Sequence, residues 1–321
     1  MKYTNLEGIS KRASRLVYGT VQPVYAGSRE EAFEALDAAW EAGFRIFDTA
    51  HSYGEDAHAE KNFGAWIEAR GVQDEVIILD KGFNPGQKGC PDVYSAQMLR
   101  DQIEESLQNL RTDCLDIYIL HRDDPRYPVD EIVEVLNEYH DKGAILRFGG
   151  SNWTYERTLE ANRYAKEHGL TGFTVCEPNY SLAVLERDPW GGSETISGEN
   201  HAQYRAYLSE NRIPVFNYSS LARGYMSGKF DPRKGVPIDQ CIAEAPILEY
   251  DSPANRARLT RVFEMAEEKG ITVPQLSLAW LLHKDLEIFP LIAPSAHHIA
   301  ENLAALDVEL TPQEADWLLG G

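Results

Sequence analysis

The sequence predicts an α/β fold, namely a (β/α)8 TIM barrel, and three observations support this prediction. Eight short runs rich in Val, Ile and Phe alternate with amphipathic stretches of helical length. Strands that alternate with helices pair in parallel, because a parallel pair needs a crossover connection. Eight is also the number of strands that closes a barrel of this kind. We therefore expect residues 1–321 to form a single barrel domain.

The candidate strands follow one another at spacings that leave room for helices. The expected strands are RLVYGT (15–20), FRIFDTA (44–50), EVIILDKG (75–82), CLDIYILHR (114–122), AILRFGGSN (144–152), GFTVCEPNYS (172–181), IPVFNYSSL (213–221) and EIFPLIAPS (287–295). The stretches between them carry capping residues, acidic first turns and terminal glycines, which are typical of helix ends. The expected helices are SREEAFEALDAAWEAG (28–43), DVYSAQMLRDQIEESLQNL (92–110), PVDEIVEVLNEYHDKG (128–143), TYERTLEANRYAKEHG (154–169) and SPANRARLTRVFEMAEEKG (252–270).

A doubly wound open sheet is the rival architecture, and it would place a glycine-rich phosphate loop after the first strand. The sequence there, YGTVQP at 18–23, does not fit GxGxxG, so the barrel is favoured. Residues 223–252 form a segment too long and irregular for a plain connector, and such segments are usually functional.

Composition restricts the partners and the location of the protein. The formal net charge of −20 disfavours binding to nucleic acid or anionic membranes. None of the four cysteines forms a CxxC pair, so neither a zinc nor a redox motif is indicated. No apolar run is long enough for a membrane span, and the N-terminus does not resemble a signal peptide. We expect a cytoplasmic protein without a metal site, whose oligomeric state is open.

Polar side chains recur where the expected strands end, which is the rim that carries the active site in such barrels. Asp48 ends the second strand and Lys81 the third, while His121 ends the fourth. Tyr53 lies in the loop after Asp48. Since Asp80 and Lys81 are adjacent in a strand, they point to opposite faces, and one of them faces the barrel interior. A buried lysine needs a carboxylate partner, and Asp48 is placed to supply it.

Each of these residues also has an ordinary structural explanation when it is considered alone. Asp48 fits a turn cap, His121 a hydrogen-bonded core histidine and Tyr53 a loop aromatic. The nearby His51 and His58 fit local hydrogen bonding. The functional hypothesis depends on the combination of Asp, Tyr, Lys and His at consecutive strand ends.

This combination suits the reduction of a carbonyl group. A tyrosine is a weak acid with a pKa of about 10, and a neighbouring ammonium lowers that value. We expect Lys81 to act in this way on Tyr53, with Asp48 holding Lys81 in place. Tyr53 would then donate a proton to a developing alkoxide, while His121 orients the carbonyl. No side chain supplies a hydride, so the reaction needs a nicotinamide cofactor.

The sequence resembles the aldo-keto reductase superfamily over almost its whole length. The motifs that carry the resemblance are FDTAHSYG (47–54), LDKGF (79–83), YILHRDDP (118–125), GGSNW (149–153), EPNYSL (177–182), NYSSLARGYMSGKF (217–230) and AEN (300–302). The resemblance implies a (β/α)8 fold and NAD(P)H-dependent interconversion of aldehydes or ketones with alcohols. It also implies that Tyr53 is the general acid, that Asp48 and Lys81 tune it, and that His121 orients the substrate.

The resemblance further implies a set of cofactor-binding positions. Gly19 and Thr20 would lie beneath the nicotinamide, and Tyr218 would stack on its ring. The remaining positions would hold the carboxamide (Ser151, Asn152, Glu177), the pyrophosphate (Ser219, Leu221, Arg223, Gly224) and the adenosine side (Ser295, His298, Asn302).

Two departures from the family pattern concern this cofactor. Many members have glutamine where this chain has Glu177, and a carboxylate cannot donate a hydrogen bond unless it is protonated. The loop IAPSAHHIAEN (292–302) contains His297 and His298 but neither Lys nor Arg, which usually bind a 2′-phosphate. NADP(H) is the first expectation and NAD(H) the alternative.

Aromatic residues in the loops could form the walls of a pocket for a small organic substrate. Trp190, Tyr225 and Phe230 are the candidates, and core or surface packing is the more common role for any single one of them.

Two other functions compete with a reductase. A metal-dependent barrel hydrolase would use Asp48, His51, His58 and His121. The sequence has no HxH pair on the first expected strand, where many such hydrolases have one, and this function would leave Lys81 unexplained. A catalytically weak regulatory member of the same fold would bind a nucleotide without rapid turnover. The four reactive residues argue for catalysis.

Overall fold

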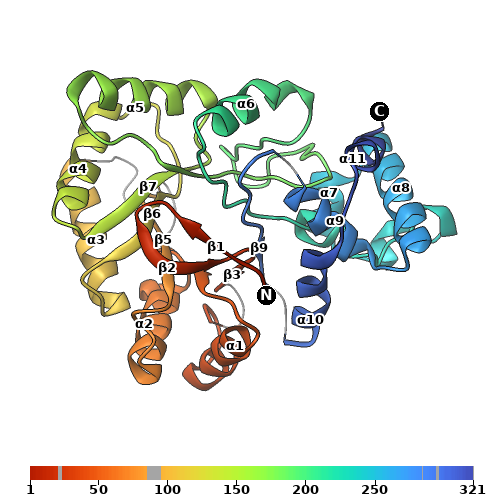
Figure 1. The fold of residues 1–321 in the computed structure, drawn as a ribbon, viewed down its shortest axis with the longest axis horizontal. Helices are drawn as coiled ribbons and strands as arrows, with labels where there is room; N and C mark the ends of the chain where they lie inside the picture. The colour runs from red at the N-terminus through yellow and green to blue at the C-terminus, as the bar shows by residue number, and fades with distance from the viewer. Residues whose placement is uncertain (21–23, 85–94, 284, 294–295, 321) are drawn as a thin grey trace. The chain divides into compact units, whose positions relative to one another are not determined.

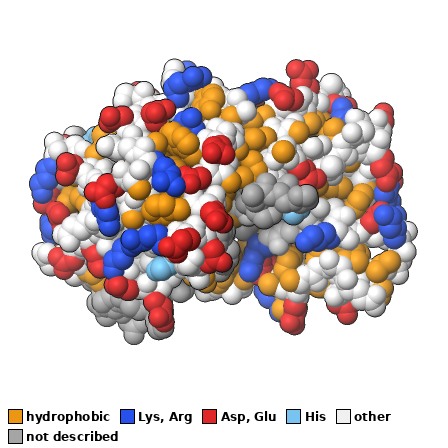
Figure 2. Space-filling model, turned by 90° about the horizontal axis from the view of Figure 1, so that it is seen from below, with side chains coloured by type: hydrophobic (Ala, Val, Ile, Leu, Met, Phe, Trp, Pro, Cys, Tyr) orange, Lys and Arg blue, Asp and Glu red, His pale blue; other side chains and the backbone are white. Residues whose placement is uncertain are grey.

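The computed structural model describes residues 1–20, 24–84, 95–283, 285–293 and 296–320. The chain divides into two compact units, residues 1–177 and 178–321, which are described separately. Acidic side chains are scattered over the face shown in Figure 2 rather than gathered into one patch. The prediction that residues 1–321 form a single domain stays a prediction.

The first unit is built on a parallel sheet in the order β3-β4-β5-β6-β7-β8. These strands are β3 (Val17–Gly19), β4 (Ile46–Asp48), β5 (Ile77–Gly82), β6 (Leu115–Leu120), β7 (Ile145–Ser151) and β8 (Val175–Glu177). Almost every residue in them is buried, as expected for strands covered on both faces. Each of the first six strand predictions contains one of these strands. A hairpin that the sequence analysis missed, β1 (Tyr3–Leu6) with β2 (Ile9–Ser14), precedes them.

Helices follow the strands and cover the outer side of the sheet, where Figure 1 shows α2, α3, α4 and α5 in succession. The helices of this unit are α1 (Arg29–Glu41), α2 (His58–Arg70), α3 (Ala96–Leu110), α4 (Val129–Asp141) and α5 (Tyr155–His168), with a 3-10 turn η1 (Glu55–Ala57) before α2. Ser28 begins α1 with a capping box, because its hydroxyl accepts from the Glu31 amide while the Glu31 side chain accepts from the Ser28 amide. The four helices expected in this unit are present, and α2 was missed.

The second unit is mainly helical. It contains α6 (Ala202–Glu210), α7 (Glu244–Tyr250), α8 (Pro253–Lys269), α9 (Val273–Leu282), β9 (Leu291–Ile292), α10 (Ala296–Ala304) and α11 (Pro312–Leu319), with the 3-10 turns η2 (Glu199–His201), η3 (Ala222–Gly224), η4 (Pro232–Lys234), η5 (Ile238–Gln240) and η6 (Ala305–Asp307). The expected helix at 252–270 is α8. The segment 223–252 is irregular as predicted, being made of short turns and α7.

The last two expected strands are shorter than predicted. Val215 and Ile288 form an isolated parallel bridge, and only Leu291–Ile292 is a strand, so 213–221 is not a continuous one. The two segments still run side by side, since Phe289 donates its amide to the Val215 carbonyl at 2.7 Å. Pro214 and Pro290 within these segments have no amide proton to donate to a neighbouring strand, which explains the interrupted pairing.

We predict that Gly64→Ala destabilises the protein by about 1–3 kcal/mol through overpacking. Gly64 lies in α2, and an added Cβ would stand 2.4 Å from the Asn109 carbonyl oxygen in α3. Urea unfolding measures the effect. Gly71→Ala is the matched control, because it has open space but a φ of +63°, so it should cost about 1 kcal/mol by backbone strain alone. Equal stability of Gly64→Ala and the wild type would contradict the close approach of α2 and α3.

Candidate active site

The centre of the site is an ion pair between neighbouring strands. Lys81 in β5 donates a hydrogen bond from Nζ to Oδ2 of Asp48 at the end of β4. Glu177 at the end of β8 also lies near the lysine, with its Oε1 at 3.5 Å from Nζ. All three side chains are at most 3% exposed. The sequence prediction that Asp48 is the partner of Lys81 is therefore correct.

Burial and the neighbouring charges determine the protonation of this cluster. Burial opposes the ammonium of Lys81, but Asp48 and Glu177 outweigh it and raise the pKa of Lys81 above its ordinary value. Burial raises the pKa of Glu177 well above its usual range, with Lys81 opposing and Asp48 adding to the rise. Two carboxyls therefore share one ammonium, and burial favours the protonated form of Glu177.

Tyr53 lies close to this cluster in the loop between β4 and η1. The Lys81 Nζ stands 5.0 Å from the centre of the Tyr53 ring. The next residue, Gly54, has a φ of +85°, and a Cβ there would lie 2.7 Å from the Tyr25 carbonyl oxygen, so only glycine suits this turn. The loop motif thus needs its glycine in order to bring Tyr53 back over the strand ends.

The pKa of Tyr53 differs from the sequence expectation. Burial raises the pKa of the phenol above its ordinary value, and the charge of Lys81 offsets this only in part. The expected net lowering is therefore wrong for this structure, although Lys81 acts in the predicted direction. Tyr53 is a protonated phenol at neutral pH.

His121 follows β6 and faces Tyr53. The two rings make an edge contact with their centres 5.8 Å apart, and the His121 Nδ1 lies 3.4 Å from the Ser52 hydroxyl. Burial, followed by the charges of Lys81 and Arg122, lowers the pKa of His121 well below its ordinary value, so the imidazole is neutral. The four residues Asp48, Tyr53, Lys81 and His121 are thus brought together as the sequence predicted.

Several cofactor candidates of the first unit border the same cluster. Gly19 pairs with Asp48 in the sheet, and the Thr20 amide donates to the Asp48 carbonyl at 2.8 Å. Ser151 pairs in register with Glu177. Asn152 has a φ of +59° and donates from Nδ2 to the His121 carbonyl at 3.1 Å. Among the described residues, the Thr20 hydroxyl and Oε2 of Glu177 are buried without a hydrogen-bond partner.

The candidates of the second unit lie on one loop and one helix. Tyr218 makes an edge contact with Trp190, their ring centres 6.3 Å apart. Arg223 stacks on Trp190 and is ion-paired with Glu249. Positive φ angles occur at Ser219, Ala222, Arg223 and Gly224. On α10, Asn302 is buried and His298 exposed, while Ser295 falls outside the described residues.

Two of the three aromatic candidates for a substrate wall do not face solvent. Tyr225 and Phe230 are 0% and 2% exposed and belong to the core, so packing is their role and they are not candidates for a wall. Trp190 is 46% exposed and keeps that candidate role.

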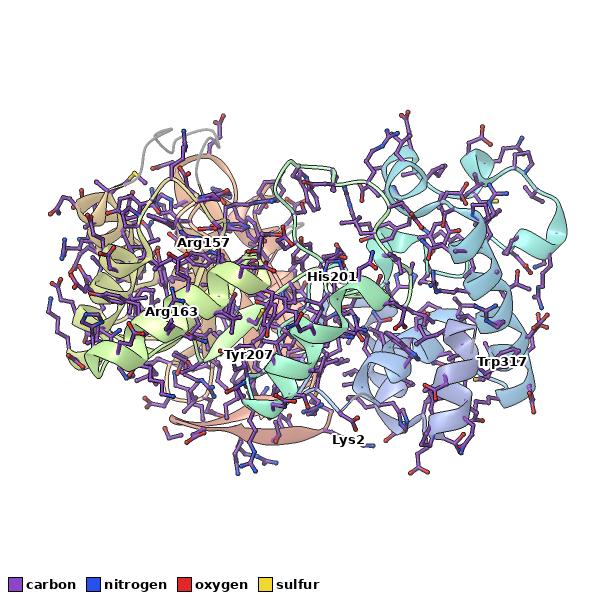
Figure 3. All side chains as sticks on the ribbon, turned by 90° about the horizontal axis from the view of Figure 1, so that it is seen from above. Lys2, Arg157, Arg163, His201, Tyr207 and Trp317 are labelled. Atoms are coloured by element: carbon purple, nitrogen blue, oxygen red, sulfur yellow. The ribbon has the colours of Figure 1, made fainter. Side chains whose placement is uncertain are left out.

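The structure also shows supporting residues that the sequence analysis missed. Arg157 of α5, labelled in Figure 3, donates to both carboxylate oxygens of Asp123 at 2.9 and 3.0 Å. Arg157 also donates to the Tyr127 carbonyl, which fixes the loop that follows His121. Asn84 donates to the Ser52 hydroxyl at 3.3 Å. The only sequence signal was the position of Asp123 inside the motif YILHRDDP, since its partner is distant along the chain.

The residues proposed for the metal-dependent alternative have other partners. His51 contacts Glu105, His58 contacts the Gly27 carbonyl, and Asp48 is paired with Lys81. In the described part of the chain, no three His, Cys, Asp or Glu side chains converge on a possible metal site. No helix in that part has the length and apolarity needed to cross a bilayer.

The buried pair of Lys81 and Asp48 lies at the ends of neighbouring parallel strands, next to the Tyr53 phenol and close to the His121 imidazole. The sequence matches the aldo/keto reductase family over residues 15–318, and this chain belongs to that family. The predictions of family, (β/α)8 fold and oxidoreductase enzyme are thereby confirmed.

Known proteins similar to this chain include enzymes and a channel subunit. A norsolorinic acid reductase of Emericella nidulans is 27% identical, covering 89% of this chain and 70% of its own length. A probable voltage-gated potassium channel subunit beta of Oryza sativa subsp. japonica is 28% identical, covering 98% and 95%. The crystal structure of an aldo/keto reductase from Klebsiella pneumoniae, in complex with NADP and acetate, matches with a TM-score of 0.70 and 26% identity, covering 97% and 92%.

We predict that Lys81→Met destabilises the protein by about 3–5 kcal/mol at about pH 7, because it leaves Asp48 and Glu177 buried without a cation. Both carboxyls would then hold protons more tightly in the folded chain than in the unfolded chain. Stability should therefore recover as the pH falls towards about 5. Urea unfolding at both pH values provides the measurement.

Lys142→Met is the matched control for this variant. Lys142 is 56% exposed and pairs with Glu138 on the surface of the protein, so its loss should cost less than about 1 kcal/mol. If the two variants were equally stable at every pH, the buried cluster would not have the charge balance described above.

Proposed function

We propose that this protein is an NADP(H)-dependent oxidoreductase that interconverts an aldehyde or ketone with an alcohol, with Tyr53 as the proton donor for reduction. The single observation that carries the proposal is the placement of Tyr53 over the buried Lys81–Asp48 pair and beside the neutral His121. When bound, the nicotinamide cofactor supplies or accepts the hydride, which no side chain can do.

The side chains have complementary roles in this reaction. Tyr53 is protonated at neutral pH and donates its proton to the carbonyl oxygen as negative charge develops there. The Lys81 ammonium lies beside the ring and stabilises the resulting phenolate, while Asp48 holds the ammonium in place. His121 is neutral and donates a hydrogen bond that orients the carbonyl without introducing a competing charge.

The nicotinamide would be held by four residues of the first unit, namely Thr20, Ser151, Asn152 and Glu177. Two buried polar atoms without partners support this assignment. Oε2 of Glu177 and the Thr20 hydroxyl both lack a partner among the described residues and suit a polar ligand. Since the pKa of Glu177 is raised well above its usual range, its acid O–H can donate to a carboxamide oxygen. Glu177 can in this way replace the glutamine of other family members. Gly19, next to Thr20, completes this set of residues.

The other cofactor-binding positions that the family resemblance implies belong to the second unit. Tyr218 offers an aromatic face for the nicotinamide ring. The pyrophosphate would be lined by Ser219, Leu221, Arg223 and Gly224. The backbone of this loop has several positive φ angles, and such strained conformations cluster at ligand sites. Ser295, His298 and Asn302 would lie on the adenosine side. The substrate is a small molecule, and a cytoplasmic location remains our expectation.

A second candidate function is a nucleotide-bound regulatory protein with slow turnover. The relative from Oryza sativa that is described as a channel subunit supports it. The complete set of Asp48, Tyr53, Lys81 and His121 favours catalysis over this alternative. Steady-state turnover of an aldehyde panel with NADPH and NADH separates the two functions.

Tyr53→Phe is expected to lower kcat for carbonyl reduction by at least about 100-fold, because the proton donor is lost. Cofactor affinity should be unchanged, as measured by fluorescence titration. Tyr164→Phe is the control, since Tyr164 lies on the surface of α5 and donates to Glu134. Turnover of Tyr53→Phe close to that of the wild type would remove Tyr53 from its proposed role.

We expect NADPH to bind more tightly than NADH, but by no more than about tenfold. The loop 292–302 offers no Lys or Arg for the 2′-phosphate, so discrimination has to come from weaker donors. Titration of the protein with each cofactor, followed by nicotinamide fluorescence, measures the ratio. A preference above about 100-fold would show that a cation from elsewhere binds the phosphate.

A further inference from the structure

Behind the proposed active site lies a second pair of acidic side chains that catalysis does not use. Asp80 of β5 and Glu60 of α2 are both 0% exposed. Asp80 precedes Lys81, and because side chains alternate along a strand, it points to the opposite face of β5. That face packs against α3, which in turn packs against α2.

The surroundings of this pair are polar. The Ser106 hydroxyl and the Asn109 amide of α3 donate to the two oxygens of Glu60, each at 2.8 Å. Neither oxygen of Asp80 has a hydrogen-bond partner of ordinary geometry among the described residues. The groups that act on Asp80 are the Ser106 hydroxyl, the Lys81 amide, the Glu60 carboxyl and, from the far face, the Lys81 charge.

Two carboxyl groups in contact inside a protein cannot both be ionised, because the low dielectric makes their repulsion too strong. Glu60 and Asp80 act on each other directly. Burial raises the pKa of both carboxyls above their usual range. Both oxygens of Asp80 lack a hydrogen-bond partner of ordinary geometry among the described residues, and a proton held between the carboxyls would supply one of them with a partner.

The position of the pair connects it to the two residues that perform the proposed chemistry. Ala59, next to Glu60, donates its amide to the Tyr53 carbonyl at 3.0 Å. Asp80 is next to Lys81 in the chain. A proton shared between Glu60 and Asp80 would therefore tie the start of α2, which is fixed to Tyr53, to the strand that carries Lys81.

We propose that Glu60 and Asp80 share one proton at neutral pH and that this carboxyl pair positions Tyr53 relative to Lys81. Loss of the proton at alkaline pH replaces a hydrogen bond by repulsion between two buried charges and loosens α2 from β5. The groups that face the pair are Ser106 and Asn109 from α3 and Lys81 from β5, and Asp48 of β4 also senses the charge of Asp80. The positioning role rests on the proposed reductase function, whereas the shared proton does not.

The shared proton is tested without cofactor by infrared spectroscopy and by thermal unfolding. We expect the carbonyl stretch of a protonated carboxylic acid in the wild type, and a weaker band in both Asp80→Asn and Glu60→Gln. The folded chain keeps a proton that the unfolded chain releases above about pH 4. Wild-type stability should therefore fall as the pH rises, and Asp80→Asn should reduce this slope. An unchanged band in both single variants, or an unchanged slope, overturns the shared proton.

The positioning role is tested by the pH profile of kcat/KM. Asp80→Asn keeps a donor towards Glu60 but has no proton to lose, so it should retain activity at neutral pH and move the alkaline limb to higher pH. Asp80→Ala breaks the connection and should lower kcat/KM about tenfold or more at every pH. Activity that is retained in Asp80→Asn but lost in Asp80→Ala supports the positioning role. An alkaline limb in Asp80→Asn that coincides with that of the wild type overturns it.

Asp116→Asn is the matched control for this series. Asp116 is equally buried, but it accepts from Lys11 at 2.8 Å and from the Ile78 amide at 2.9 Å. This variant should lose stability without moving the alkaline limb. If the wild type shows no turnover with either nicotinamide cofactor, the proposed function fails, while the infrared and unfolding experiments still decide whether the proton is shared.

Discussion

The ion pair between Lys81 and Asp48 is the interaction on which the rest of the site depends. A lysine in the middle of a sheet is costly to bury, and only a carboxylate in direct contact offsets that cost. The sheet provides this contact because β4 and β5 are neighbours and both side chains lie near the carboxyl ends of their strands. Tyr53 and His121 then gather around a fixed positive charge.

More carboxyl groups surround the Lys81 ammonium than its single positive charge can neutralise. Asp48 contacts the ammonium directly, Glu177 lies 3.5 Å away, and Asp80 lies behind the strand. Burial raises the pKa values of Glu177, Glu60 and Asp80, which favours the uncharged forms of these carboxyls. A protonated carboxyl can donate a hydrogen bond, so the same physical effect supports both the proposed binding role of Glu177 and the proposed positioning role of the Glu60–Asp80 pair.

The stretch from Phe47 to Gly64 connects these features along the chain. It begins with Asp48 at a strand end, turns at Gly54 to place Tyr53, and continues into α2 with Glu60. Gly64 allows α2 to approach the backbone of α3. One continuous segment therefore supplies the partner of the buried lysine, the proposed proton donor and one half of the carboxyl pair.

The sequence by itself determined the alternation of strands and helices, the six parallel strands of the first unit and the grouping of Asp48, Tyr53, Lys81 and His121, because period and strand-end position are local properties. It failed for 213–221, where Pro214 interrupts pairing, and it left open the role of Tyr225 and Phe230, whose burial depends on distant packing. Only the tertiary structure decided that burial outweighs Lys81 at Tyr53, and that Glu60 meets Asp80. Desolvation and contacts between distant residues depend on everything packed around a group, which no sequence pattern encodes.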